Sequence, residues 1–191
     1  EKSIIYKKYN NNSNNILSMG KMNPDKIFYI IKRTPGTGLF SNVLFVLNHL
    51  IKAKKLGYIP FVDMQNFHTI YNEKNPIKNN ENAWEYYFKN LNNYTLSEIY
   101  NSKRVIFTSN EFEQDFEKDL ISEEIKDKFR KNIIVNDKYL KIVENIKKKN
   151  FLGKKILGVH FRGTSYKRSP NHPFPATKSQ IANFVAKLKK E

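Results

Sequence analysis

The stretch Lys26-Ile27-Phe28-Tyr29-Ile30-Ile31-Lys32, followed by Thr34-Pro35-Gly36-Thr37-Gly38, decides the fold class that the sequence predicts. Its first half is a run of β-branched and aromatic residues, which is typical of a buried strand. Its second half is rich in residues that form tight turns. The two halves therefore predict a strand that ends in a glycine-containing turn.

A helix and a second strand are predicted directly after this turn. Residues 39–55 place apolar side chains at helical spacing, and Gly57 is suited to end the helix. The segment Ile59-Pro60-Phe61-Val62-Asp63 then has the pattern of another strand. A strand, a helix and a strand in this order form a βαβ unit, which predicts the α/β class. The predicted apolar stripe of the helix consists of Phe40, Val43, Leu44, Leu47, Leu50 and Ile51.

This unit resembles a dinucleotide-binding fingerprint. Gly36 and Gly38 lie in the turn, Ser41 takes the place of the third glycine, and Asp63 ends the second strand, where it could bind a ribose. One candidate function is therefore an NAD(P)-binding oxidoreductase. No Gly-Lys-Ser/Thr follows the glycines, which excludes a Walker A loop.

A second motif lies in Lys155-Ile156-Leu157-Gly158-Val159-His160-Phe161-Arg162-Gly163-Thr164-Ser165-Tyr166. The pattern predicts a buried strand that stops at Gly163, with His160 and Arg162 on the same face. A guanidinium at the carboxyl end of a strand suits phosphate oxygens, and the turn through Thr164 and Ser165 adds hydroxyl groups and backbone N–H groups. The local chemistry predicts a phosphate site.

The pattern His160-x-Arg162-x-Thr164 resembles the signature of the fucosyltransferase superfamily, which includes α1,6-fucosyltransferases, nodulation fucosyltransferases and protein O-fucosyltransferases. The similarity extends over residues 26–191 and is densest in residues 36–67 and 156–180. It implies a GT-B fold, with a Rossmann-like N-terminal domain and the start of a second Rossmann-like domain. Many members have an acidic residue where this chain has Ser165.

The resemblance also implies roles for individual residues. Arg162 would bind the diphosphate of a GDP-sugar, with His160 and Thr164 orienting it, and Asn42 would lie across the cleft. The remaining candidate substrate-binding residues are Gly36, Gly38, Gly163, Ser165 and His172. The implied reaction transfers a sugar to a hydroxyl of a surface polysaccharide or lipopolysaccharide, and fucose is the expected sugar. It proceeds with inversion and without a metal or other cofactor.

The general base for the acceptor hydroxyl is the least defined role. Asp63, Glu73 and Glu85 are the candidate acids, and Asp63 is preferred because it ends a strand. The aromatic-rich residues 64–100 are a candidate acceptor surface. Trp84, Tyr87 and Phe88 are alternatively the apolar side of a short helix, which is the favoured interpretation.

Three segments are expected along the chain: a polar leader or linker (1–23), an acceptor-side Rossmann-like domain (24–150) and the beginning of the nucleotide-sugar domain (151–191). The 191 residues are fewer than a two-domain transferase needs, so a fragment that is inactive alone is expected. The sequence also predicts a strand over 104–108 and helices over 113–132, 137–149 and 179–190. A capping box formed by Thr177 and Gln180 would open the last of these helices.

The formal charge of +16 favours anionic partners. The lysines are spread along the chain without a clustered stripe of basic and aromatic residues, so a nucleic-acid-binding module is only a second alternative. The lysine run at 147–149 is interpreted first as a solvated helix end, and segment 147–154 as the domain boundary. Contact of this basic segment with an anionic membrane is the alternative, and a location in the cytoplasm, with the inner membrane face as an option, is expected. The apolar stretch 39–51 is too short and too polar for a membrane span.

Overall fold

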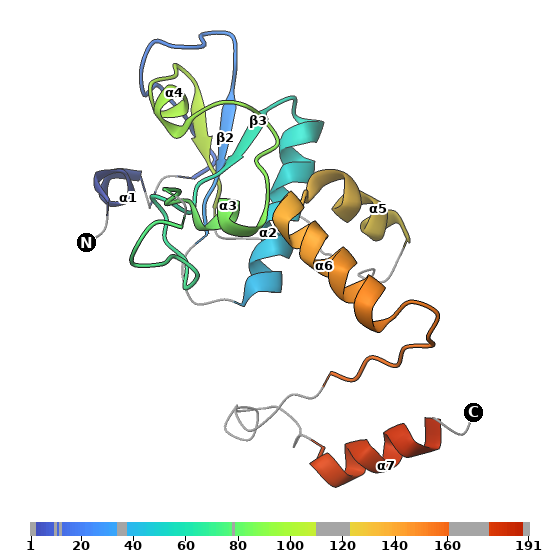
Figure 1. Ribbon diagram of the computed structural model, residues 1–191. Coiled ribbons are helices and arrows are strands. Elements are labelled where there is room, and N and C mark those ends of the chain that lie inside the picture. Colours follow the sequence, from blue (N-terminus) through green and yellow to red (C-terminus); the bar gives the residue numbers. More distant parts are fainter. Residues whose placement is uncertain are drawn as a thin grey trace. The chain divides into compact units, whose positions relative to one another are not determined.

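One open four-stranded sheet organises the α/β structure. Figure 1 shows the computed structural model. The structure describes residues 3–9, 11, 13–33, 38–77, 79–109, 123–160 and 176–188. Their contacts divide the chain into two units, residues 1–144 and residues 145–191. The sheet lies entirely in the first unit.

The sheet is mixed, with the strand order β1-β4-β2-β3. The strands are β1 (Ile16–Leu17), β2 (Phe28–Ile31), β3 (Ile59–Val62) and β4 (Val105–Phe107). Strand β2 is parallel to both of its neighbours, with Tyr29 opposite Pro60 on one side and Ile106 on the other. Strand β1 runs antiparallel to β4 at the edge. The predicted α/β class is therefore confirmed.

Helix α2 (Leu39–Lys55) joins β2 to β3, as the spacing of apolar residues predicts. Gly38 caps its start, and Gly57 follows its end with a φ of +67°, a left-handed conformation that glycine adopts at little cost. Phe40 departs from the predicted apolar stripe, because its side chain is 76% exposed. The buried residues of the helix are Asn42, Val43, Phe45, Val46, Leu47, Asn48, His49, Leu50, Ile51 and Ala53.

Strand β2 is buried on both faces, which explains its uninterrupted apolar sequence. Tyr29 and Ile31 point into the core that α2 covers. Phe28 and Ile30 point into a second core on the opposite face, together with Phe67. Because successive side chains of a strand alternate, one short segment supplies both cores.

The first residues of the chain belong to the fold. Helix α1 (Ile4–Tyr9) contacts the second core, where Tyr9 stacks on Phe107 at 5.2 Å between ring centroids. Tyr6 lies 5.9 Å from Phe67. Residues 1–23, expected to be a polar leader or linker, therefore contribute a helix and β1. The reason is that a few apolar side chains among the asparagines pack against the second core, while the backbone of β1 pairs with β4.

Between β3 and β4 the chain forms two short capped helices. Asn82 caps α3 (Ala83–Tyr87) by accepting a hydrogen bond from the backbone N–H of Trp84. Helix α4 (Leu96–Tyr100) starts with a capping box between Thr95 and Glu98. The favoured interpretation of the aromatic cluster is confirmed here in part, since Trp84 and Tyr87 belong to α3 and Phe88 directly follows it.

Three longer helices follow β4. They are α5 (Glu123–Asn132), α6 (Asp137–Asn150) and α7 (Lys178–Leu188). The predicted helices over 137–149 and 179–190 are confirmed, and the Thr177–Gln180 capping box is formed. None of the described helices is long and apolar enough to cross a membrane.

The buried strand predicted at residues 155–161 is not formed over its described part. Residues 155–160 have no regular structure and are exposed, with exposed fractions of 53% for Ile156, 50% for Leu157 and 49% for Val159. A strand is stable only when neighbouring strands supply its hydrogen bonds. The described residues of the second unit contain no strand that could pair with it.

Candidate functional site

The carboxyl ends of the three parallel strands meet at one edge of the sheet. Lys32 and Arg33 follow β2, Asp63 follows β3, and Thr108 follows β4. Open α/β sheets bind their ligands at this edge. We therefore take it as the candidate site.

Thr108 joins the loops that follow β2 and β4. Its side-chain oxygen Oγ1 accepts a hydrogen bond from the backbone N–H of Lys32 at 3.1 Å and donates one to the carbonyl of Lys32 at 3.2 Å. Thr108 is fully buried and Lys32 is 3% exposed. These two hydrogen bonds fix the backbone where it leaves β2, and they hold the charged residue Lys32 in a buried position.

The two basic side chains after β2 lie against aromatic rings. The Lys32 ammonium is 5.5 Å from the ring centroid of Phe67, and the Arg33 guanidinium carbon is 4.4 Å from that of Phe45. Burial lowers the pKa of Lys32 to about 8 and also lowers the pKa of Arg33. Since burial of a cation is unfavourable, two at one edge create a region that attracts an anion.

The first turn of α2 adds to this positive region. The N-cap residue Gly38 has no side chain that could accept a hydrogen bond from the first N–H groups of the helix. The first turn also contains no acidic residue. The first backbone N–H groups of a helix lack partners within the helix, and the helix dipole favours negative charge near them. Gly36, in the preceding turn, lies outside the described residues.

Asp63 is held within its own loop. Its oxygen Oδ1 accepts hydrogen bonds from the backbone N–H groups of Gln65 and Asn66 at 3.0 and 2.8 Å. Its oxygen Oδ2 accepts from the Asn66 side chain at 2.9 Å and from the Tyr100 hydroxyl at 2.6 Å. Asp63 is fully buried, and burial raises the pKa of its carboxyl although these hydrogen bonds act in the opposite direction.

This geometry gives Asp63 a structural role. A ribose hydroxyl or an acceptor hydroxyl would need access to its oxygens, and the side chain has none. Of the alternative bases, Glu85 accepts hydrogen bonds from the side chains of Asn80, Asn82 and Asn90, and Glu73 is exposed. Asn82 also ties α3 to the end of β3, by donating to the carbonyl of Val62 at 2.7 Å.

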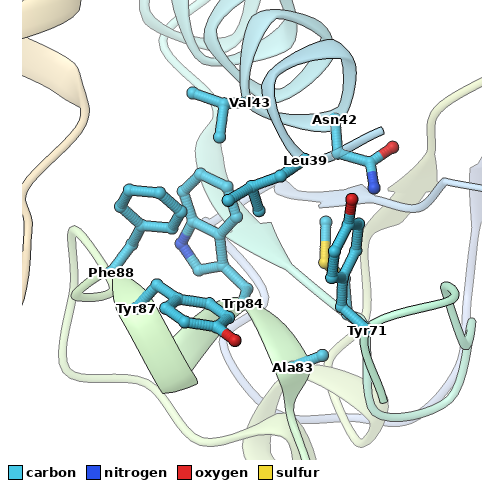
Figure 2. A pocket seen from close by; sticks show the side chains of 9 residues that line it. Leu39, Asn42, Val43, Tyr71, Ala83, Trp84, Tyr87 and Phe88 are labelled. Carbon is cyan, nitrogen blue, oxygen red and sulfur yellow. The ribbon is translucent and has the colours of Figure 1, made fainter. Parts of the chain in front are cut away.

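Asn42 lies in a small aromatic pocket beside the first turns of α2. The residue is 2% exposed, and Gly38 rather than Asn42 is the N-cap. Figure 2 shows the Asn42 amide and the Tyr71 hydroxyl pointing toward one another, with the Trp84 indole deeper in the pocket. The space in it that a water-sized sphere can occupy is about 10 Å³, far below the volume of a typical ligand site. Its lining residues are Leu39, Asn42, Val43, Met64, Tyr71, Ala83, Trp84, Tyr87 and Phe88.

The motif that carries the resemblance is mostly outside the described residues. Arg162, Gly163, Thr164, Ser165 and His172 all belong to the segment that the structure does not describe. His160, at the edge of that segment, is exposed and has no regular secondary structure. The expected face shared by His160 and Arg162 therefore depended on a strand that is not formed over residues 155–160.

Sequence reasoning missed Lys32, Arg33 and Thr108 as members of the sheet edge. The available signal was the position of two basic residues directly after an apolar strand, one residue before the glycine-containing turn. Among the described residues no group of three His, Cys, Asp or Glu side chains could hold a metal ion.

Comparisons with known proteins give no family assignment. No protein-family model matches the chain, and no curated protein or solved structure matches it. The α/β fold with its mixed sheet is therefore the level at which the chain is classified.

Proposed function

We propose that this protein is a glycosyltransferase of the fucosyltransferase-like GT-B type. It would transfer a sugar from a GDP-sugar to a hydroxyl of a surface polysaccharide or lipopolysaccharide, and fucose is the expected sugar. The observation that supports the proposal most is the positive edge of the sheet, where Lys32, Arg33 and the first turn of α2 lie next to the glycine-containing turn. Such an edge would attract an anionic substrate such as a nucleotide sugar, whose diphosphate itself is assigned to Arg162.

In the proposed reaction the bond between the anomeric carbon and the diphosphate oxygen breaks while the acceptor oxygen attacks from the opposite face. The departing diphosphate gains negative charge, and Arg162 compensates it with charge-assisted hydrogen bonds. His160, Gly163, Thr164, Ser165 and His172 would complete the donor site, as the resemblance implies.

Across the cleft from this donor site the proposal places the glycine-containing turn with Gly36 and Gly38, together with Asn42. No metal takes part, because the arginine supplies the positive charge. The acceptor hydroxyl passes its proton to solvent as the new bond forms. Asp63 is not assigned as the base, because that carboxylate is buried and takes part in four hydrogen bonds.

The burial of Asp63 also favours the transferase over an NAD(P)-dependent oxidoreductase. The dinucleotide fingerprint needs an acidic residue that reaches a ribose hydroxyl. In this chain the matching carboxylate is fully buried and bonded to Gln65, Asn66 and Tyr100. The nucleic-acid-binding alternative gains no support, because the lysines are spread along the chain without a clustered stripe of basic and aromatic residues.

Calorimetric titration of the full-length protein with GDP, GDP-fucose, NAD and a short DNA duplex tests the proposal. We expect the GDP compounds to bind, and Arg162→Ala to weaken binding at least tenfold, because a hydrogen bond to a charged group contributes about 1.5–3 kcal/mol. Arg130→Ala is the matched control: Arg130 is an exposed arginine of α5, ion-paired with Asp127. Its removal should leave GDP binding unchanged.

The opposite results are equally informative. Binding of NAD alone, with no effect of Arg162→Ala, would contradict the transferase and support the oxidoreductase. Binding of DNA alone, with a steep dependence on salt, would support the nucleic-acid-binding module.

A further inference from the structure

Helix α6 exposes an apolar face after its first turn. Ile142, Val143 and Ile146 are spaced by one, three and four residues, which places them on one side of the helix. Their exposed fractions are 51%, 57% and 46%, and no residue of the helix is buried. Helices of water-soluble domains are usually stabilised by packing such a face against a core, so an exposed one suggests an external surface that covers it.

The start of α6 is fixed by contacts within the first unit. Tyr139 stacks on Tyr87 at 5.6 Å between ring centroids, and the backbone N–H of Asn136 donates to the carbonyl of Tyr87 at 2.9 Å. Lys89 and Asp137 form an ion pair at 2.9 Å. These contacts hold the first turn of α6 to the fold, and the apolar residues that follow in the helix are exposed.

The charges around this face are nearly all positive. Residues 137–155 contain seven lysines and two acidic residues. Phe151 and Leu152, directly after the helix, are 44% and 76% exposed. An amphipathic helix with lysines on its polar face and exposed apolar residues on the other is typical of helices that lie in the interface of a membrane.

We propose that α6 lies on the surface of a membrane that contains anionic lipids, with Ile142, Val143 and Ile146 inserted below the headgroups and the neighbouring lysines among them. An anionic bilayer complements both the charge and the apolar character of this face. A second copy of the chain complements only the apolar character of this face, because it has the same formal charge of +16. The proposal depends on α6 alone and not on the transferase activity.

Co-sedimentation of the purified protein with vesicles tests the inference. We expect binding to vesicles of equal parts phosphatidylcholine and phosphatidylglycerol, little binding to phosphatidylcholine alone, and weaker binding as salt is raised. Lys148→Gln/Lys149→Gln should weaken binding about thirtyfold, since each lysine near an anionic surface contributes about 1 kcal/mol. Ile142→Gln/Ile146→Gln should weaken it about tenfold by removing the inserted apolar groups.

The matched control is Lys54→Gln/Lys55→Gln, which removes two adjacent lysines from the last turn of α2. It should change binding less than about twofold, because its effect on net charge is the same but its position is different. Far-UV circular dichroism should be unchanged in every variant, because the α6 positions are exposed and glutamine is a good helix former.

Three results would overturn the inference. The first is equal binding to both kinds of vesicle, or none. The second is an equal loss in the α2 control, which would leave only a general charge effect. The third is a dimer in sedimentation equilibrium that Ile142→Gln/Ile146→Gln converts to a monomer, which would make the face a contact between copies of this chain.

Discussion

Replacement of Asp63 by alanine is predicted to destabilise the fold strongly, because this carboxylate organises the loop after β3. The change removes the acceptor of four hydrogen bonds and leaves the N–H groups of Gln65 and Asn66 and the hydroxyl of Tyr100 without it. Each orphaned donor costs about 1–3 kcal/mol when buried, and water can reach the half-buried ones. The expected loss in the free energy of unfolding is about 4 kcal/mol.

Asp63→Asn is the matched control for shape. Its remaining oxygen can keep the hydrogen bonds from Gln65 and Asn66, so about 2 kcal/mol is expected. Urea unfolding measures both changes, with the fluorescence of Trp84, the only tryptophan, and circular dichroism as independent probes. A loss below about 1 kcal/mol for Asp63→Ala would refute the structural role given to this carboxylate.

The pH dependence of Asp63 follows from the direction of its shift. Burial raises the pKa of the carboxyl above its ordinary value of 3.8, so the folded chain binds this proton more tightly than the unfolded chain. The resulting stabilisation is complete below the ordinary pKa and is lost as pH rises through the folded value. The cost of Asp63→Asn should therefore increase when the pH is lowered from neutral toward 4. A constant cost would contradict the raised pKa.

Two further predictions concern Gly20 and Lys32. A Cβ at Gly20 would lie 2.1 Å from the carbonyl oxygen of Asn101, so Gly20→Ala should lower the free energy of unfolding by about 1–3 kcal/mol. The control is Gly158→Ala, which has open space around it and should have no effect in the same urea titration. Burial lowers the pKa of Lys32 from 10.5 to about 8. Between these two pH values the unfolded chain binds this proton and the folded chain does not, so the contribution of Lys32 to the free energy of unfolding rises with pH. Lys32→Met should remove roughly 3 kcal/mol of that increase, and an unchanged pH profile would refute the assignment.

Local sequence patterns predicted the βαβ unit closely. The apolar run at residues 26–32, the helical spacing at 39–55 and Gly57 each act through neighbours in the sequence, so β2, α2 and the turn after it occur where expected. The capping box at Thr177 and Gln180 was predictable for the same reason.

Features that depend on distant contacts could not be predicted in this way. The pairing of β1 with β4 joins segments almost ninety residues apart, and nothing in the polar sequence of residues 10–15 indicates it. The expected strand is not formed over its described residues 155–160 for the converse reason, because a strand-like sequence needs partners that the pattern cannot supply. At the site, the role of Asp63 was decided by Tyr100 and Asn66, which no spacing rule relates to it.

The pairing of β1 with β4 has a consequence for how the chain reaches its folded state. During synthesis, residues 16–17 leave the ribosome long before residues 105–107, so β1 is already available to pair with the outer edge of β4 when that strand emerges. An unpaired strand edge can bind the edge of another chain. The two residues of β1 therefore act as a cover against intermolecular sheet formation, and their removal would increase aggregation during refolding more than it would alter the rest of the sheet.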